Sequence, residues 1–471
     1  MSERYDLIEA RFMNDALDEL RRYVEIECLS PDFDPEWAAH GEIDRAVELL
    51  ASWARQRHLK DAAISVRSLP GRTPALLMEI PAFAGGTGTA LLYGHLDKQP
   101  PLGDWTEGLG PFTPVRQGDL LFGRGTADDG YSLFAAVLAL ESLQAMGTPH
   151  PRCAILIEAS EESGSPDLEA HLDDLGDQLG DVDLVVCLDS GALSYDRLWV
   201  TTSLRGCVML SVEVEVLDHG VHSGEASGVV PSSFRILRQL LDRLEDPKTG
   251  EMLVPELDAY IPSHHLAAAS QLSAELGDPL SHHFPLVKGL ELMGRDGAEH
   301  LIRQSWSAAL SIIGIDGIPS VAEGGNVLRA STTLKLSIRT PPSIDAQRAQ
   351  DAVLGVLRAE PPSGAKVTVT ANHPAPGWVA PPPAHWLADA LAVASEEAFG
   401  RAPSFVGEGG SIPFLASLGK RFSEAQFVVT GVLGPGSNAH GPNESLHLPM
   451  AVGVTTAVAS VVAALSRHAG S

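Results

Sequence analysis

The chain has 471 residues and a formal net charge of −28, with 44% hydrophobic and 6% aromatic residues. This length exceeds what one hydrophobic core usually holds, so we expect two domains. The acidic balance argues against nucleic acid and acidic membrane surfaces as partners, because both bind basic faces.

The cysteines and the N-terminal sequence predict a cytoplasmic protein. The four cysteines, Cys28, Cys153, Cys187 and Cys207, form no CxxC pair and indicate no disulfide framework. The N-terminal "MSERYDLIEARF" is charged from its start and lacks the apolar region of a signal peptide. No apolar stretch approaches the ~18–20 residues that a membrane span requires, so we expect no membrane-spanning segment.

Helix-like and strand-like segments alternate in the first part of the chain. The spacing of apolar residues predicts helices over residues 15–29 and 132–146, and short apolar runs predict strands at 89–97, 153–160 and 183–191. Such alternation is typical of a mostly parallel sheet with helices on its faces. We therefore expect an α/β domain.

The middle of the chain has a different pattern. Residues 207–218 alternate apolar and acidic side chains, which predicts a strand with one solvated face, and residues 231–246 have the spacing of an amphipathic helix. After a less regular stretch, residues 329–340 and 365–372 alternate again. Two helices with several half-exposed antiparallel strands predict a smaller α+β sandwich.

The last part of the chain returns to the first pattern. The Pro-rich residues 373–386 are typical of a linker, residues 427–444 of a strand followed by a polar loop, and residues 451–468 of a helix. The smaller domain is therefore expected to be inserted into the larger one. The predicted boundaries are 1–204 and 379–471 for the main domain and 205–378 for the inserted domain.

Histidines and carboxylates follow the predicted strands of the main domain at the points where these strands end. In an open α/β sheet, sites form where loops leave the carboxyl ends of the strands. We therefore expect these side chains to converge, although they are far apart in the sequence. They are His95, Asp97, Asp128, Asp129, Glu161, Glu162, Asp189 and His440.

This set of side chains predicts a metal site. Imidazole and carboxylate groups are ligands of Zn²⁺, and the lack of a nearby cysteine disfavours a closed structural zinc site. Asp128, Glu162 and Asp189 bring negative charge that two divalent cations and a hydroxide would neutralise, so we expect a pair of ions, which can activate water and hold a developing oxyanion. Of the adjacent Glu161 and Glu162, one would then bind metal and the other would transfer protons.

Each of these signals is weak when taken singly. The histidine in "HLD" could be a core or surface residue, "EE" is common on solvated loops, and Asp128 or Asp129 could cap the helix that begins near Gly130. Only the joint pattern, in this order and at strand ends, supports a metal site.

The segments "YGHLDKQP", "GRGTADDG", "EASEESGS", "CLDSG" and "NAHGPNE" resemble, in order, the motifs of the co-catalytic metallopeptidase family. That family includes carnosinase, cytosolic non-specific dipeptidase, glutamate carboxypeptidase, aminoacylase and succinyl-diaminopimelate desuccinylase. The resemblance covers nearly the whole chain and is closest to the dipeptidase-like members. It implies a zinc-exopeptidase α/β catalytic domain with an inserted lid and dimerisation domain.

The resemblance also implies a role for each residue of the predicted site. His95 and Asp189 would hold one metal ion, Glu162 and His440 the other, and Asp128 would bridge both. Glu161 would be the general acid and base, and Asp97 would orient His95 through its second ring nitrogen. The Asp128–Asp129 peptide bond would be a candidate for the cis form.

Further motifs resemble the substrate-binding elements of the family. His222, in "DHGVHSGEASG", would reach the active site of a partner subunit and steady the tetrahedral oxyanion, which implies a homodimer. Arg339, in "LKLSIRT", and Gly410 and Ser411, in "GEGGSIP", would bind the substrate carboxylate. Alternatively, Arg339 could be an exposed strand residue and His222 a loop histidine.

Two departures from the family pattern concern the substrate. Gly130 stands where lysine is usual, and "GPGSN" before His440 differs from the more usual dipeptidase pattern. The sequence therefore predicts a dinuclear metal hydrolase, most simply a dipeptidase, that binds two Zn²⁺ ions, with Mn²⁺ or Co²⁺ as alternatives. The rival predictions are an N-acyl amino acid deacylase, desuccinylase or carboxypeptidase on the same scaffold, and an inactive binding or regulatory protein.

Overall fold

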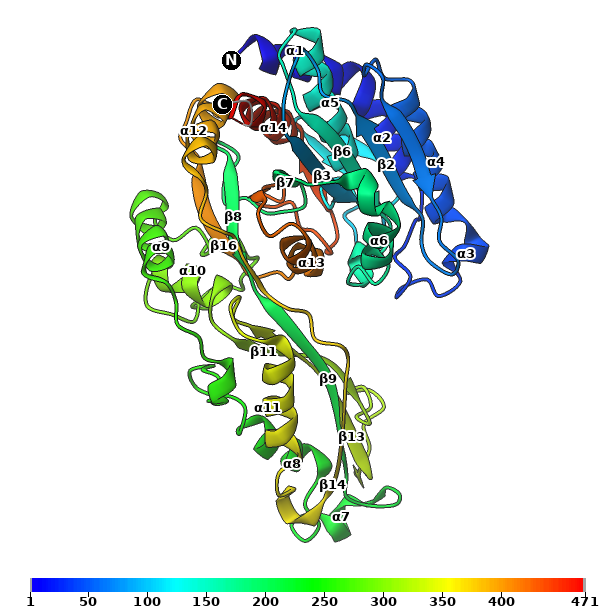
Figure 1. Ribbon diagram of the computed structural model, residues 1–471. Coiled ribbons are helices and arrows are strands. Elements are labelled where there is room, and N and C mark those ends of the chain that lie inside the picture. The colour runs from blue at the N-terminus through cyan, green and yellow to red at the C-terminus, as the bar shows by residue number, and fades with distance from the viewer. Residues whose placement is uncertain (1, 469–471) are drawn as a thin grey trace. The chain divides into compact units, whose positions relative to one another are not determined.

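The computed structural model describes residues 2–468, apart from the side chains at positions 177 and 413, and the chain forms two compact units (Figure 1). Unit 1 comprises Met1–Thr202, Ala380–Val406 and Ser417–Ser471, and unit 2 comprises Ser203–Val379 and Gly407–Ala416.

Three short segments differ from the predicted domain boundaries, since residues 203–204, Val379 and residues 407–416 lie in unit 2. All of residues 379–471 were expected in the main domain, but residues 407–416 belong to unit 2. A contact within unit 2 explains the difference, because the Arg205 guanidinium donates a hydrogen bond from Nε to the Gly409 carbonyl oxygen at 3.2 Å.

Unit 1 is built on a six-stranded sheet with the strand order β1-β2-β6-β3-β7-β17. β3 pairs in parallel with β6 and β7, and β7 pairs in parallel with β17, whereas β1–β2 and β2–β6 are antiparallel. The prediction of a mostly parallel sheet is confirmed. The strands are β1 (Ala63–Arg67), β2 (Ala75–Ile80), β3 (Thr89–His95), β6 (Arg152–Glu158), β7 (Leu184–Cys187) and β17 (Gln426–Val429).

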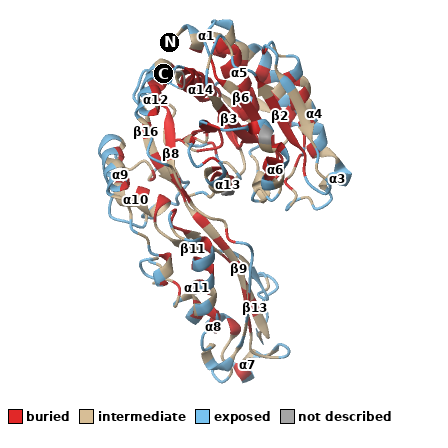
Figure 2. Cartoon of the chain, in the orientation of Figure 1, coloured by how far each residue is buried: buried red, intermediate tan, exposed pale blue. Residues whose placement is uncertain are grey.

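Helices of unit 1 pack on this sheet and on one another. α5 contacts β3, β6 and α14, and its residues from Ser132 to Leu143 are all buried. Figure 2 shows that buried residues predominate in β3, β6 and α14. The helices are α1 (Glu3–Arg11), α2 (Leu17–Val24), α3 (Trp37–His40), α4 (Glu42–Arg55), α5 (Ser132–Ala145), α6 (Leu168–Leu179), α12 (His385–Phe399) and α14 (Leu448–His468), with a π-helical turn at Phe12–Ala16.

The C-terminal helix α14 corrects the expectation that no segment is long and apolar enough to span a membrane. It has 21 residues, and its most apolar window has a mean hydropathy of 2.0. In the structure 89% of that window is buried, and the helix packs against α5 and α12. Thr455, Thr456 and Ser460 interrupt the run of apolar side chains, so the sequence shows no continuous apolar stretch of that length.

Unit 2 contains a four-stranded antiparallel sheet with the order β11-β13-β9-β14. Alternate residues of β9 and β13 are buried, among them Val212 and Leu336, and they form one core with Ile236 of α8 and Val353 of α11. The strands are β9 (Gly206–Glu215), β11 (Ala309–Asp316), β13 (Ser331–Thr340) and β14 (Lys366–Ala371); the two helices are α8 (Ser233–Leu241) and α11 (Ala346–Arg358).

The stretch between residues 247 and 328 is more regular than predicted. It contains α9 (Ser263–Leu276), α10 (Gly297–Ser305) and the edge strand β11. The exposed isoleucines of β11 do not alternate with polar residues, so the period-2 signal is absent there.

Three small sheets and two short α-helices accompany these elements. A three-stranded sheet contains β18 (Ser445–His447), β5 (Leu120–Phe122) and β4 (Val115–Gln117), and a second contains β15 (Trp378–Val379), β8 (Trp199–Leu204) and β16 (Ser404–Glu408). A two-stranded pair joins β10 (Val221–His222) to β12 (Val327–Leu328), and α7 (Ser223–Ala226) and α13 (Pro413–Arg421) are short helices.

Candidate metal centre

Side chains from the ends of three parallel strands meet at one edge of the unit 1 sheet. His95 is the last residue of β3, Glu161 and Glu162 lie in a 3₁₀ turn after β6, and Asp189 follows β7. Because β3 lies between β6 and β7 in parallel pairing, the carboxyl ends of all three strands lie side by side.

The first group of potential metal ligands is buried. His95 Nε2 lies 3.3 Å from Asp128 Oδ1 and 3.7 Å from Asp189 Oδ2. His95 is 1% exposed, Asp128 6% and Asp189 8%. Ligand atoms of these residues all lie within 4.8 Å of one another, which is close enough for one ion to contact them together.

The second group uses the other carboxylate oxygen of Asp128. His440 Nε2 lies 2.9 Å from Asp128 Oδ2 and 3.2 Å from Glu162 Oε2. These three ligand atoms also lie within 4.8 Å of one another. Asp128 therefore belongs to both groups and presents one oxygen to each.

The donor set fits divalent metal ions. Within residues 2–468, the buried His95 Nε2 has no hydrogen-bond partner, although carboxylate oxygens surround it. Imidazole nitrogens and carboxylate oxygens are ligands of Zn²⁺ and of similar ions. An ion held here would satisfy the unpartnered nitrogen and neutralise the carboxylates together.

The pKa values of the two histidines also indicate that the site favours positive charge. Burial opposes the protonation of both imidazoles, but Asp128 and Glu162 raise the pKa of His440 to about 11, and Asp128 with Asp97 raises that of His95 well above its usual value. Protons on these rings thus compensate the carboxylates when no metal is bound.

The pKa of Glu161 is strongly perturbed by its surroundings. Burial raises its pKa well above the ordinary range, and the negative charges of Asp189, Glu162 and Asp97 act in the same direction. It belongs to neither ligand group, whereas the adjacent Glu162 contacts His440.

Asp97 supports the turn that carries both glutamates. Its carboxylate accepts backbone N–H groups from Glu161 through Oδ1 and from Glu162 through Oδ2, each at 3.0 Å. His95 Nδ1 lies 3.2 Å from the Asp97 main-chain oxygen and 3.6 Å from its carboxylate. Asp97 therefore contacts the second ring nitrogen of His95 through its backbone, while its carboxylate organises the glutamate turn.

Asp129 does not cap α5. The N-terminus of this helix has no side-chain cap, and Asp129 Oδ2 instead accepts the backbone N–H of His95 at 3.2 Å. The Asp128–Asp129 peptide bond is cis, as the resemblance implied.

The predicted substrate-binding residues lie in unit 2. Arg339 on β13 donates a hydrogen bond from Nη1 to Ser411 Oγ at 2.8 Å, so these two residues are brought together. Gly410 precedes Ser411, and open space surrounds the position that a side chain would occupy there. His222 ends β10 with an exposed side chain, and its Nδ1 accepts the Gly224 N–H at 3.1 Å.

Sequence reasoning missed three residues that support these groups. Arg205 in unit 2 contacts the loop that contains Gly409, and the burial of its guanidinium together with the charge of Arg339 lowers its pKa to about 10. In unit 1, Arg124 and Glu444 form a buried ion pair at 2.7 Å. Glu444 ends the quoted segment "NAHGPNE", but an acidic loop residue gave no sign of burial.

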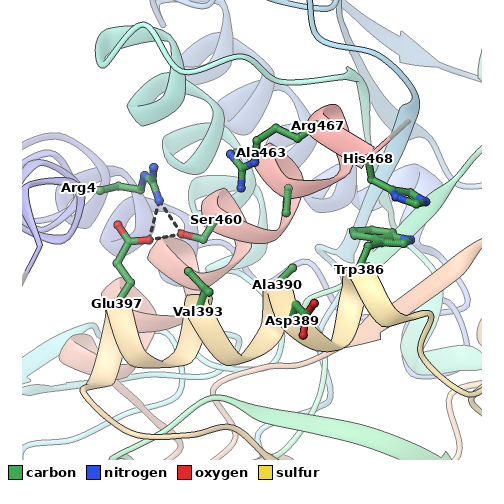
Figure 3. Close-up of a pocket in the computed structure, with 11 residues that line it drawn as sticks. Arg4, Trp386, Asp389, Ala390, Val393, Glu397, Ser460, Ala463, Arg467 and His468 are labelled. Carbon is green, nitrogen blue, oxygen red and sulfur yellow. Dashed lines mark hydrogen bonds and ion pairs between the residues drawn. The ribbon is translucent and has the colours of Figure 1, made fainter. Parts of the chain in front are cut away.

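A separate hollow of about 460 Å³ lies in unit 1 between α12 and α14 (Figure 3). Arg4 donates to Glu397 at 2.7 Å and to Ser460 at 2.5 Å along its wall, and Trp386 stacks on His468. Its lining contains none of the predicted site residues, and it mixes acidic and basic groups without a metal-ligand cluster.

Comparison with protein families gives a match over most of the chain. The model of "Peptidase family M20/M25/M40" matches residues 91–465. This interval contains every predicted metal-ligand residue.

Two relatives that match most of the chain are dipeptidases by name. The chain is 27% identical over 373 residues to the cysteinylglycine-S-conjugate dipeptidase of Corynebacterium striatum, covering 77% of this chain and 78% of the relative. It is 28% identical over 370 residues to the Cys-Gly metallodipeptidase DUG1 of Candida albicans, covering 76% and 74%.

Solved structures show the same fold. Human carnosine dipeptidase 1 superposes with a TM-score of 0.81 at 22% identity, covering 99% of this chain and 98% of that one. The dipeptidase Dug1p of Saccharomyces cerevisiae superposes with a TM-score of 0.78 at 23% identity, covering 98% of each chain. The predicted family and fold class are confirmed.

Proposed function

Because the chain belongs to peptidase family M20/M25/M40, we propose that it is a dipeptidase that works with two divalent metal ions. The observation that carries the proposal is the position of Asp128, whose Oδ1 faces His95 and whose Oδ2 faces His440. A carboxylate shared in this way suits two ions held close together. The Cys-Gly dipeptidase relatives support a dipeptide as the substrate.

Each ion would have its own ligands in addition to Asp128. His95 and Asp189 would hold one ion, and Glu162 and His440 the other. The three carboxylates carry three negative charges, which a single divalent ion would leave in excess. Zn²⁺ is the ion we propose, because it accepts both imidazole and carboxylate ligands; Mn²⁺ and Co²⁺ are alternatives that the same donors could hold.

The proposed chemistry is hydrolysis of an amide bond. Divalent ions, when bound, would polarise the scissile carbonyl and make water acidic enough to lose a proton near neutral pH. Glu161 would accept that proton and then give it to the departing amine. Its position supports this role, because Glu161 adjoins the proposed ligand Glu162 in the turn held by Asp97 and belongs to neither ligand group.

Substrate selection would rest on unit 2. Arg339 and Ser411 would bind the free carboxylate of the dipeptide, with the backbone at Gly410 leaving room for it. His222 would steady the oxyanion in the active site of a partner subunit, and its exposed side chain is compatible with that role.

A homodimer would form through unit 2. β11 is an edge strand of its sheet, and Ile312, Ile313 and Ile315 on it are about half exposed. An apolar edge strand of this kind favours pairing with another chain.

We also propose a cytoplasmic location, since Cys28, Cys153 and the remaining cysteines are free thiols.

The test is a comparison of substrates on metal-reconstituted protein. Dipeptides with a free carboxylate, including Cys-Gly, would be assayed beside N-acetyl and N-succinyl amino acids, with product identification by mass spectrometry. We expect hydrolysis of dipeptides that a chelator abolishes. Faster hydrolysis of the N-acyl amino acids would favour the deacylase alternative, and no hydrolysis of either class would contradict the proposal.

A further inference from the structure

The buried carboxylate of Glu444 gathers donors from the segment that leads to Asp128. Glu444 is 0% exposed. Its oxygens accept the backbone N–H groups of Gly125 at 3.0 and 3.1 Å, Ala127 at 3.2 Å and Asp128 at 3.2 Å. Arg124 donates to the same carboxylate from Nη1 at 2.7 Å.

No strand pairing holds this segment. The pairing of β5 with β18 ends at Phe122 and Ser445. Beyond it, the Gly123 N–H donates to the Glu444 carbonyl at 3.0 Å and the Arg124 N–H to the Pro111 carbonyl at 2.7 Å. The Glu444 side chain then accepts the N–H groups of Gly125, Ala127 and Asp128. This one side chain therefore holds most of the backbone from Gly125 to Asp128, which presents Asp128 to both ligand groups.

Arg124 extends the connection to the loop of His440. Its Nη2 donates to the carbonyl oxygen of Gly441 at 2.9 Å, directly after His440. The His440 side chain is 53% exposed and its φ is +63°, so packing and backbone preference do little to fix it. A hydrogen bond at the adjacent residue is a direct way to hold this histidine in place.

We propose that Glu444 and Arg124 are positioning residues that keep Asp128 and His440 at the separation needed to share a metal ion. The inference rests on the proposed function, because it assumes that these two residues bind metal. Neither Glu444 nor Arg124 belongs to a ligand group. Each would act on metal affinity through the backbone that it holds.

A matched control exists in the same unit. Glu141 is 3% exposed and also accepts both arginine and backbone donors, from Arg57 at 2.8 Å, Arg11 at 3.2 Å and the His58 N–H at 3.0 Å. Glu141→Gln and Glu444→Gln thus remove the same type of buried ionic contact, but only the second lies beside the proposed metal centre.

The experiment measures Zn²⁺ affinity by competition with a chromophoric chelator and, separately, the melting temperature of the metal-free proteins. We expect Glu444→Gln to weaken Zn²⁺ binding by about 10- to 100-fold, while Glu141→Gln lowers the melting temperature and binds Zn²⁺ like the wild type. Unchanged affinity in Glu444→Gln, or an equal loss in both variants, would overturn the inference.

A second variant covers the case in which Glu444→Gln does not fold. Arg124→Lys keeps the charge opposite Glu444 but loses the planar group that reaches Gly441. We expect weaker Zn²⁺ binding than in the wild type, and wild-type affinity would overturn the inference. If the wild-type chain itself binds no Zn²⁺, the proposed function is contradicted. If the wild type binds Zn²⁺ tightly and the variants do so equally well, only this inference is contradicted.

Discussion

The carboxylate of Asp97 accepts the backbone N–H of Glu161 at 3.0 Å, and its second oxygen accepts that of the next residue, Glu162. Asp97 and Glu161 were expected to act through their side chains. In the structure, the Asp97 carboxylate also contacts the backbone of both glutamates. This contact orients the proposed proton-transfer group and a proposed metal ligand together.

Replacing Asp97 should therefore impair catalysis without unfolding the protein. In Asp97→Asn, an NH₂ group replaces one carboxylate oxygen. Because this group cannot accept a hydrogen bond, the turn that contains Glu161 and Glu162 loses one contact. We expect kcat to fall by about 10- to 100-fold with the fold retained, as measured by steady-state kinetics and circular dichroism. The matched control is Asp167→Asn, because Asp167 also accepts a backbone N–H, from Thr73 at 2.9 Å. Equal losses in both variants would show that Asp97 has no special role.

The two adjacent glutamates should respond differently to the same substitution. Glu161→Gln should lower kcat by about 10²- to 10⁴-fold and leave the metal content unchanged, because Glu161 lies outside both ligand groups. Glu162→Gln should instead lower the metal content. Metal analysis of both variants beside the kinetics is decisive, and the reverse result would mean that the two roles have been exchanged.

Arg339 should discriminate between substrates with and without a free carboxylate. Arg339→Met should lower kcat/KM for a dipeptide by about 10- to 100-fold, because a charged hydrogen bond is lost, and should affect the dipeptide amide much less. Lys335→Met on the same strand is the control, since Lys335 is exposed. If acid and amide substrates lose activity equally in Arg339→Met, Arg339 does not bind the carboxylate.

The buried Glu158 should make the stability of the metal-free protein depend on pH. Burial raises its pKa from 4.5 to about 7, although the hydroxyl groups of Tyr93 and Ser165 donate hydrogen bonds to its carboxylate. A carboxyl with a raised folded-state pKa stabilises the fold fully below pH 4.5, and this contribution is lost as the pH rises toward 7. Over this range the free energy of unfolding falls by about 3 kcal/mol.

Glu158→Gln tests this dependence, since a neutral amide cannot ionise. Urea unfolding of chelator-treated protein between pH 5 and 8 should show the free energy of unfolding falling more steeply in the wild type than in the variant. Parallel curves for the two proteins would be inconsistent with ionisation of Glu158 in this range.

Strand ends were enough to predict the convergence of His95, Asp128 and Asp189. His95 and Asp189 follow buried apolar strands, and parallel pairing of β3 with β6 and β7 brings their ends together. Asp128 follows β5 of a separate antiparallel sheet, so this pairing does not account for its position. Strands β9 and β13 of unit 2 were predicted from their period, since their burial alternates strictly.

The supporting contacts were not predictable in this way. Glu444 and Arg124 have the pattern of ordinary charged loop residues, because the backbone N–H groups that Glu444 accepts and the carbonyl group to which Arg124 donates have no sequence signature. Asp97 was recognised only as a partner of His95, since its two acceptor contacts depend on the path of a 3₁₀ turn. Edge strand β11 was not predicted, because its exposed isoleucines do not alternate with polar residues.

The most direct test of the account is a metal titration of chelated protein followed by dipeptide hydrolysis. Zn²⁺ would be added to metal-free wild type and to Asp128→Asn, with bound metal and Cys-Gly hydrolysis measured at each step. We predict that wild-type activity reaches its plateau at two equivalents per chain, and that Asp128→Asn binds Zn²⁺ weakly and stays inactive. Full activity without metal, or in Asp128→Asn, would contradict the central claim.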